Sequence, residues 1–321
     1  MTHQAVMWLV FNAVVLAMLY VDLAVAQKKS HAVGLREAAL WSFVWVCVSL
    51  LFAVGIHFYL SPEKALQFLT GYVIEKSLSV DNMFVFIMIF SFFGIEAEHQ
   101  PRVLKWGILG ALLLRFILIF IGATLVARFH WVLYLFGAIL LYSAYKMAFG
   151  VEKEFNPDDN ALFRRLRRLM PMTGLAGQRF FVRLNGVLHA TPLLLALVVV
   201  EFSDVVFALD SIPAIFSITQ DTFIVYTSNV FAILGLRALY FLVSGLVQMF
   251  AFLKYGVALI LAFVGVKMLG SSFFHISTAF SLGVILSVLA FSIVLSLLFR
   301  QRPPKVAFDQ SPRPADPPVH S

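Results

Sequence analysis

Long apolar runs, separated by short polar connections, make up the chain as far as about residue 299. The hydrocarbon core of a bilayer takes about 20 consecutive apolar residues of helix. By this measure the sequence predicts nine transmembrane spans. The third and sixth runs are longer than a straight span needs, so we expect tilt or breaks there. The predicted spans cover residues 5–26, 38–60, 65–93, 103–126, 131–149, 186–217, 222–249, 255–270 and 276–299.

Two polar segments stand apart from this pattern. Residues 150–185 form the one long connection, and within it residues 161–170 mix apolar side chains with four arginines. That pattern fits a basic amphipathic helix on the inner leaflet, and equally a solvated charged linker. Residues 300–321 hold six prolines and no apolar period, so we expect a disordered tail. Residues 1–299 are therefore predicted to be one membrane domain.

Composition supports the same class of protein. The chain is 61% hydrophobic and only 13% charged, whereas soluble domains have about 45–50% apolar and about 25% charged residues. The net charge of +7 does not indicate nucleic-acid binding, because the basic residues lie mostly in short connections that face lipid headgroups. The single cysteine, Cys47, cannot form a disulfide within the sequence.

The basic residues also predict the orientation. With the N-terminus placed outside, 17 of the 24 lysines and arginines fall on the inner side, and only Lys64 and Arg128 fall in outer connections. Because connections on the cytoplasmic side carry the excess of lysine and arginine, we expect a multi-pass protein of the inner membrane. Its N-terminus is predicted outside and its C-terminus in the cytoplasm.

Two of the apolar runs contain carboxylates near mid-membrane, whereas Asp22 lies near the inner end of the first run. Residues 198–213 hold Glu201, Asp204 and Asp210, and residues 75–84 hold Glu75 and Asp81. A charge at the centre of a membrane helix costs about 2.5–3.5 kcal/mol on insertion scales, and such residues usually line ion pathways. These two segments therefore predict the functional centre of the protein.

An internal repeat relates the two acidic segments. In each half an aspartate is followed by an arginine 33 or 34 residues later, and then by a lysine after another 30 or 31 residues. Each unit contains three predicted spans, an odd number, so the units enter the membrane from opposite sides. An inverted repeat of this kind is typical of secondary transporters. The predicted units are residues 65–149, with Asp81, Arg115 and Lys146, and residues 186–270, with Asp204, Arg237 and Lys267.

The residue types near mid-membrane indicate a hard divalent cation as ligand. Carboxylate, amide and hydroxyl oxygens suit Mg²⁺, Ca²⁺ and Mn²⁺, whereas cysteine and histidine are absent from the acidic segments. Pairing of the carboxylates with Lys76, Arg115 and Arg237 is the alternative, and we expect some of it. The predicted metal ligands are Glu75, Asp81, Asn82, Glu201, Asp204 and Asp210, supported by Ser79, Asn229, Arg115 and Arg237.

Helix breaks beside these residues would free backbone carbonyls as further ligands. Proline removes an amide donor and clashes with the preceding turn. The sequence therefore predicts a break at residues 211–213, and similar loosening at residues 70–71 and 191–192.

At these same residues the chain resembles the TerC family of membrane proteins and is most similar to its Alx branch. The resemblance covers nearly the whole chain except the proline-rich tail, and it implies manganese export and an association with tellurite resistance. By motif, it makes the five carboxylates of the two segments the acidic transport residues. The matching stretches are residues 71–86, 181–183, 185–186, 190–192, 201–216 and 227–241.

The sequence thus predicts an alternating-access exporter of Mn²⁺, coupled to protons, with Mn²⁺ as substrate and no cofactor. It carries no enzyme motif. Its predicted partners are the metal ion and the bilayer, and protein partners stay open. One alternative is an exporter of amino acids or other small solutes on the same scaffold. The other is a non-transporting scaffold for tellurite resistance or for metallation of exported proteins.

Overall fold

The computed structural model describes residues 3–27, 34–129, 131–150, 179–184, 187–246, 252–271, 273 and 276–299. Within them it has ten helices and one antiparallel pair of strands. The predicted amphipathic helix at 161–170 and the predicted disordered tail lie outside the described residues. The helices are α1 (His3–Gln27), α2 (Leu35–Tyr59), α3 (Pro62–Phe92), α4 (Gln100–Arg128), α5 (Val132–Phe149), α7 (Pro192–Phe216), α8 (Thr222–Ile233), α9 (Leu236–Leu246), α10 (Leu253–Leu269) and α11 (Thr278–Leu298).

The helices are those of a multi-pass membrane protein. Among the described residues, five are long and apolar enough to cross a bilayer, namely α2, α4, α5, α7 and α11. The pair α8 and α9 makes a sixth when it is counted as one span bent by 50°. Large apolar side chains on these helices point outward, with Leu51 70% and Phe291 63% exposed. In a bilayer, such faces contact lipid rather than water.

Two predictions about helix breaks are wrong. The helix α7 continues through Pro213 and ends only at Phe216, so the loss of one backbone hydrogen bond is confined to its last turn. The helix α3 is 31 residues long and continues without a break through Thr70 and Gly71. In both helices, packing against several neighbours outweighs the local weakness.

The predicted span 186–217 also begins differently. Residues 187–190 form the strand β2 (Val187–Ala190), which pairs with β1 (Phe181–Leu184) in the register Phe181 opposite Ala190. The helix α7 starts only at Pro192, with Thr191 as its N-cap, because proline suits the first helical position. The Thr191 hydroxyl donates to the Arg179 carbonyl at 2.8 Å and so ties the hairpin to the helix.

A break occurs instead within the predicted span 222–249. The helices α8 and α9 are separated by Leu234 and Gly235, and Gly235 has φ +78°. Glycine adopts this left-handed conformation without penalty. A Cβ at that position would overlap the indole of Trp45 on α2. The position therefore requires glycine for its backbone and for its packing.

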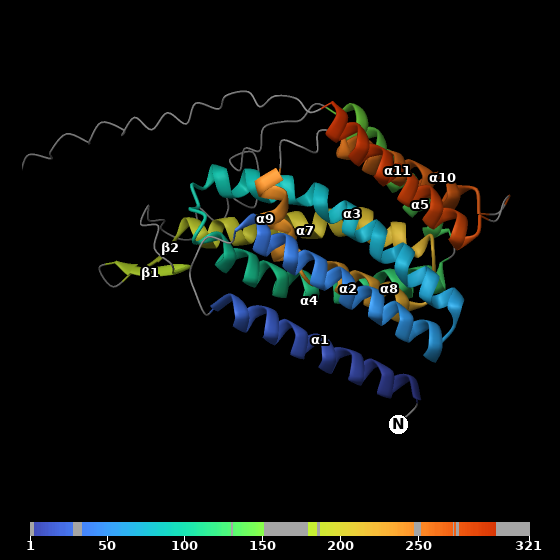
Figure 1. The fold of residues 1–321 in the computed structure, drawn as a ribbon, viewed down its shortest axis with the longest axis horizontal. Helices are drawn as coiled ribbons and strands as arrows, with labels where there is room; N and C mark the ends of the chain where they lie inside the picture. The colour runs from blue at the N-terminus through green and yellow to red at the C-terminus, as the bar shows by residue number, and fades with distance from the viewer. Residues whose placement is uncertain are drawn as a thin grey trace, which may run out of the picture.

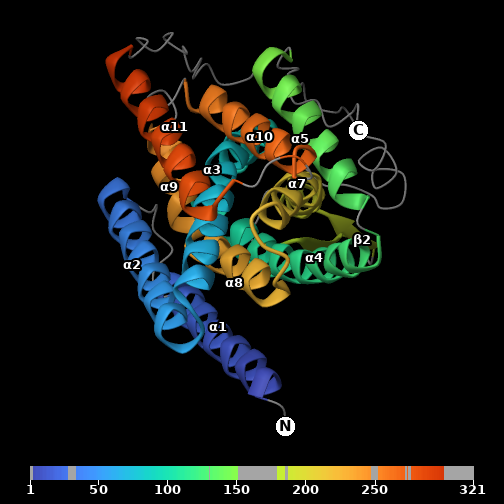
Figure 2. The same ribbon diagram turned by 90° about the vertical axis from the view of Figure 1, so that its right-hand side faces the viewer.

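The helices surround α3 and α7 at the centre of the molecule. The helix α3 contacts α2, α7, α8, α9, α10 and α11, and α7 contacts α4 and α5. Figure 1 shows α1 at one edge, with α5, α10 and α11 grouped at the opposite edge, and Figure 2 shows the same separation from the side. The acidic segments of the sequence therefore lie on the two most central helices.

Small residues allow close helix contacts beside the acidic segments. A Cβ on Gly71 of α3 would lie 2.8 Å from the Ser228 hydroxyl of α8. A Cβ on Gly137 of α5 would lie 3.2 Å from the Gly265 carbonyl of α10. Membrane helices pack tightly at such positions because no side chain separates the backbones. The contact at Gly71 brings the following turn of α3 against the next residue of α8, Asn229.

Candidate metal-binding site

Arg115 on α4 is the centre of the buried polar cluster. Its Nη1 donates to Glu75 of α3 in a very short contact and to Asn229 Oδ1 of α8 at 2.7 Å. Its Nε and Nη2 donate to the two carboxylate oxygens of Asp204 on α7, at 3.4 and 3.2 Å. Nη1 also lies 3.3 Å from the Ser211 hydroxyl. Three helices, α3, α7 and α8, thus contribute side chains to the guanidinium of a fourth, α4. The predicted pairing of carboxylates with Arg115 is confirmed.

Helix periodicity explains why these side chains meet. Asp204 and Ser211 are seven residues apart on α7, so they lie on the same face two turns apart. Glu75 follows Gly71 by one turn on α3, where that helix lies closest to α8. Asn229 is held in place because its amide nitrogen donates to the Val225 carbonyl, which leaves its oxygen for Arg115.

The cluster is removed from solvent and from lipid. Glu75 and Asn229 are fully buried, and Arg115 is 2% exposed. Buried charges require partners, since an uncompensated charge in the interior is strongly unfavourable. Here two carboxylates, those of Glu75 and Asp204, face one guanidinium. When both are ionised, their charge exceeds that of the guanidinium, and Lys76, the next residue of α3 after Glu75, supplies a second positive charge that offsets the excess.

Glu201 adds a third carboxylate next to this cluster. It precedes Asp204 by one turn of α7, and its carboxylate lies where a Cβ of Gly110 on α4 would stand. Its Oε2 is buried and makes no hydrogen bond to any described residue. A carboxylate oxygen in that position can accept a bond from a cation or from water, so Glu201 extends the oxygen-rich surface beside Asp204.

The other predicted ligands lie outside the cluster around Arg115. Asp210 is half-buried and accepts a hydrogen bond from Ser143 of α5 at 2.6 Å. Asp81 and Asn82 lie about 9 Å further along the axis of α3 than Glu75. Ser79 is fully buried one turn beyond Glu75, and Arg237 is a buried residue of α9. The structure therefore brings together Glu75, Asp204, Asn229 and Arg115, with Glu201 adjacent.

Three contributing residues were not predicted as site residues. Ser211 could have been found because it repeats the position of Asp204 after seven residues. Gly110 and Ser143 carry no such signal, because their roles depend on which helices become neighbours. The contacts of α4 with α7, and of α5 with α7, appear only in the fold.

A small cavity lies beside Asp204. Its volume is about 10 Å³, room for about one water molecule. Asp204 is its one charged lining residue, and the rest are apolar or glycine, from α3, α4, α7, α8 and α9. They include Phe86 and Leu104, which lie toward the end of the bundle where α3 connects to α4. The cavity is thus small, and its lining is apolar except for Asp204.

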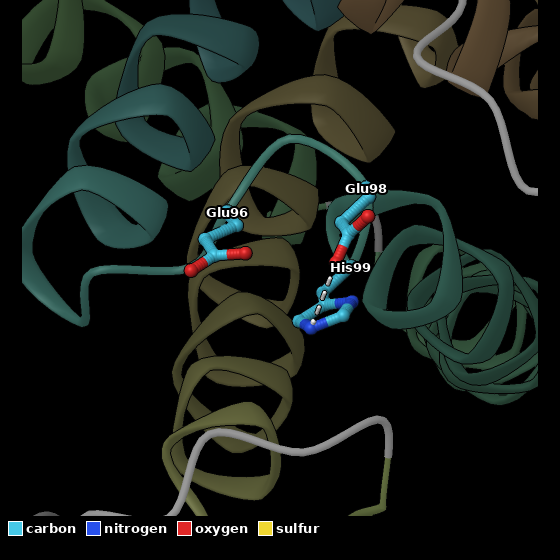
Figure 3. A group of neighbouring side chains, drawn as sticks. All are labelled: Glu96, Glu98 and His99. Atoms are coloured by element: carbon cyan, nitrogen blue, oxygen red, sulfur yellow. Dashed lines mark ion pairs between the residues drawn. The ribbon is translucent and has the colours of Figure 1, made fainter.

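A separate group of possible ligands lies in the connection between α3 and α4. One ligand atom each of Glu96, Glu98 and His99 lies within 4.8 Å of the others, and His99 Nε2 is 3.5 Å from Glu98 (Figure 3). Both glutamates are exposed and directly precede α4. Carboxylates are favourable at a helix N-terminus because of the helix dipole. That position accounts for the pair without a metal ion.

The apolar helices and the buried charge cluster define the chain as a multi-pass integral membrane protein with an ionisable centre. A family model described as integral membrane protein TerC family matches residues 60–304, and the chain belongs to this family. A protein of Escherichia coli (strain K12), named as a candidate membrane-bound redox modulator, Alx, is 50% identical over 300 residues, which is 90% of this chain and 94% of that protein.

Other relatives carry less specific names. An uncharacterised membrane protein of Myxococcus xanthus is 50% identical over 299 residues, covering 93% of this chain and 94% of that protein. An uncharacterised membrane protein of Rickettsia felis is 39% identical over 292 residues, covering 91% of this chain and 97% of that protein. No solved structure matches the chain. The predicted membership of the TerC family, in its Alx branch, is confirmed.

Proposed function

We propose that the protein exports a divalent metal ion, Mn²⁺, across the inner membrane by alternating access. The observation that carries this proposal is the set of buried oxygen ligands around Arg115, drawn from α3, α7 and α8. Carboxylate, amide and hydroxyl oxygens are the ligands that hard divalent cations take. A water-excluded cluster of these groups in a membrane protein has few other uses.

Arg115 determines how the ion is bound in this proposal. Its guanidinium holds the carboxylates of Glu75 and Asp204 together and neutralises part of their charge. A metal ion that binds the same oxygens must displace the guanidinium from them. Binding and release of the ion are therefore coupled to a movement of the Arg115 side chain relative to Glu75 and Asp204.

The topology that we propose has nine spans, with the N-terminus outside and the C-terminus in the cytoplasm. The five long apolar helices and the bent pair α8–α9 supply six, and α1, α3 and α10 supply the others. An Asp159→Cys variant in a Cys47→Ser background tests the orientation. It should resist membrane-impermeant thiol reagents in intact cells, and ready labelling from outside would contradict this topology.

In this proposal the two predicted units form an inverted repeat, and the ion site lies between them. Arg115 belongs to the first unit and pairs with Asp204 of the second. The helices α5 and α10, each the last of its unit, pack closely at Gly137 and Gly265. Rocking of one unit against the other would open the site to either side in turn. At the predicted outer end, Lys64 of α3 pairs with Asp221 at the start of α8 at 2.7 Å, which favours closure there.

Proton coupling supplies the energy in this proposal. Moving a divalent cation outward against an inside-negative potential costs about 2.3 kcal/mol per charge per 100 mV. Protons entering on Asp210 or Glu75 would replace the departing ion. Mn²⁺ flux in proteoliposomes should then depend on the size and sign of an imposed pH gradient at fixed voltage. Flux that ignores the gradient would rule out proton coupling.

The central experiment is Mn²⁺ flux in proteoliposomes that contain the purified protein. Asp204→Asn and Glu75→Gln keep the side-chain size but remove a charged oxygen ligand, so each should abolish flux. Glu96→Gln, a change at an exposed carboxylate, is the matched control and should transport normally. Normal flux in both site variants would refute the cation site. Inhibition by amino acids rather than by divalent ions would favour a small-solute exporter.

The name of the Escherichia coli relative suggests a second reading, redox modulation. The sequence holds one cysteine, Cys47, so it offers no internal dithiol for such chemistry. The same variants, assayed in cells, distinguish a scaffold role in tellurite resistance or metallation from transport. For that role the carboxylates of Glu75 and Asp204 should be dispensable, whereas residues 150–185 should not.

A further inference from the structure

A second set of buried polar side chains lies on α2 and α3, two helices that contact each other. Four of them have a side-chain polar atom that is buried and makes no hydrogen bond to any described residue. They are Ser42, Trp45, Tyr72 and Ser79. All four residues are no more than 9% exposed. The second carboxylate oxygen of Glu75, Oε2, is likewise buried and makes no hydrogen bond to any described residue.

The residues that carry these atoms form one stripe on each of the two helices. On α3, Tyr72, Glu75 and Ser79 occupy positions i, i+3 and i+7, which share one face of a helix. On α2, Ser42, Trp45 and Ser49 have the same spacing, and all three are buried. The two helices contact each other and are joined by the short turn between Tyr59 and Pro62.

Residues of the two stripes also lie at matching distances along their helices from the turn that joins α2 and α3. Counted from the turn, Ser42 is as many residues away as Ser79, and Ser49 as many as Tyr72. Trp45 is level with Lys76 by the same count. We call this contact, built by Ser42, Trp45, Ser49, Tyr72 and Ser79, the polar seam.

Direct hydrogen bonds between the helices do not account for the polar seam. Polar residues at membrane helix contacts usually bond across the contact. Here Ser49 donates to the Trp45 carbonyl of its own helix at 2.8 Å. The Tyr72 hydroxyl lies beside the Ser49 side chain, which is the direct polar contact between the two helices at this level, and Ser42, Trp45 and Ser79 have no such contact with a described residue. Buried polar atoms without any partner are costly, and bound water is the usual partner where protein groups are missing.

The centre of the polar seam lies next to the break between α8 and α9. The indole of Trp45 covers Gly235, with its Cδ1 atom closest to that glycine. At the same level Lys76 donates to the Ala232 carbonyl at 3.2 Å, a carbonyl in the last turn of α8. The polar seam therefore adjoins unwound backbone on one side and Glu75 on the other.

We propose that the polar seam holds a row of water molecules that ends at Glu75 Oε2 and supplies water ligands to the transported ion. The presence of water in the polar seam does not depend on the proposed function, whereas the supply of water ligands to the ion rests on it. Small divalent cations dehydrate reluctantly and usually keep several water ligands inside a protein. The cavity beside Asp204 has room for about one water molecule. The polar seam offers hydroxyl and indole groups that can hold more.

The first test needs no substitution. The full-length protein in lipid nanodiscs is exposed to X-ray-generated hydroxyl radicals, and modified side chains are quantified by mass spectrometry. Radicals formed from bound water label adjacent side chains even when these are buried. Trp45 and Tyr72 should be modified several-fold faster than Tyr240, which is equally buried but donates to Gln100 at 2.9 Å. Equal protection of Tyr72 and Tyr240 would overturn the proposal.

The second test uses apolar isosteres. The triple variant Ser42→Ala, Tyr72→Phe, Ser79→Ala should have a lower melting temperature and slower radical labelling of Trp45, because the water loses its partners. A dry contact predicts an unchanged or raised melting temperature, since unsatisfied polar atoms are removed. Ser77→Ala is the control, because Ser77 is buried on the same helix and its hydroxyl donates only to the Val73 carbonyl.

The link to the ion is tested by pulsed electron paramagnetic resonance of bound Mn²⁺ in deuterated water. The triple variant should show fewer exchangeable deuterons on the ion than the wild-type protein. An unchanged number would overturn the supply of water ligands. Absence of Mn²⁺ binding or flux in the wild-type protein would refute the proposed function. The radical labelling of Trp45 and Tyr72 would still decide whether the polar seam holds water.

Discussion

Two aspartates of α7, only six residues apart, are held in different ways. Asp204 is 7% exposed and receives bonds to both oxygens from Arg115 of α4. Asp210 is half-buried and accepts one bond from the Ser143 hydroxyl of α5. Six residues of a helix turn the side chain by more than one and a half revolutions, so the two acids face different neighbours.

The Asp204 carboxylate is held in one place by its partners, whereas the Asp210 carboxylate remains accessible to an ion or a proton. Asp204 is part of a charge network with little freedom, since its removal leaves other charges unpaired. Asp210 has the Ser143 hydroxyl and the nearby charge of Lys146 on α5 as partners, and it keeps part of its surface open. The helix α7 therefore offers one carboxylate suited to building a site and a second suited to a transient contact with an ion or a proton.

The largest effect should come from removal of the charge at the centre of the network. Arg115→Gln leaves Glu75 and Asp204 buried without their counter-charge, and loss of one partner of a buried pair costs about 3–5 kcal/mol. The melting temperature of the purified variant should fall strongly. Added Mn²⁺ should recover part of the loss, because a divalent cation can neutralise the same carboxylates.

The control for this change is Arg128→Gln. Arg128 lies in the last turn of the same helix and is exposed. A surface charge of this kind contributes little to stability. Equal melting temperatures for the two variants would contradict a structural role for the Arg115 network.

The next effect sharpens the comparison within α7. Asp204→Asn should weaken Mn²⁺ binding by at least about 100-fold, because it removes a charged ligand and the partner that positions Arg115. Asp210→Asn should weaken Mn²⁺ binding by less than about tenfold, since Asp210 lies outside that network. Isothermal titration of the purified variants with Mn²⁺ measures both. A larger loss for Asp210→Asn would reverse the assignment.

The sequence alone predicted much of this centre. Intramembrane charge pointed to Glu75 and Asp204 as site residues, and their pairing with Arg115 followed from the need of buried charges for partners. Periodicity and length placed a helix within each predicted span. What the sequence could not predict is which faces become neighbours, and so Asp210 was grouped with Asp204.

The break was misplaced for a related reason. Proline at position 213 is a strong local signal, yet it falls in the last turn of α7, where one lost hydrogen bond matters little. Gly235 lacks a strong signal, because glycine occurs widely in membrane helices. Its left-handed backbone and its contact with Trp45 depend on the position of α2, which no local pattern gives.

A smaller effect tests the third carboxylate. Gly110→Ala would place a methyl group where the Glu201 carboxylate lies, so that flexible side chain must turn away from Asp204. Mn²⁺ affinity should fall by about tenfold, the size of a change in ligand support, with little change in melting temperature. Gly283→Ala is the control, because its Cβ would meet open space. Unchanged affinity in Gly110→Ala would exclude Glu201 from the site.

The smallest effect concerns Asp210 itself. Ser143→Ala removes the hydroxyl that donates to Asp210, and a typical hydrogen bond contributes about 1 kcal/mol. Because Asp210 is half-buried, water can replace the lost donor, and the melting temperature should change only slightly. Mn²⁺ affinity should not change, since the Arg115 network is untouched. In proteoliposomes, however, the rate of Mn²⁺ flux should change if Asp210 makes transient contacts during transport. A variant with wild-type flux at every pH gradient would show that the Ser143 contact of Asp210 has no part in transport.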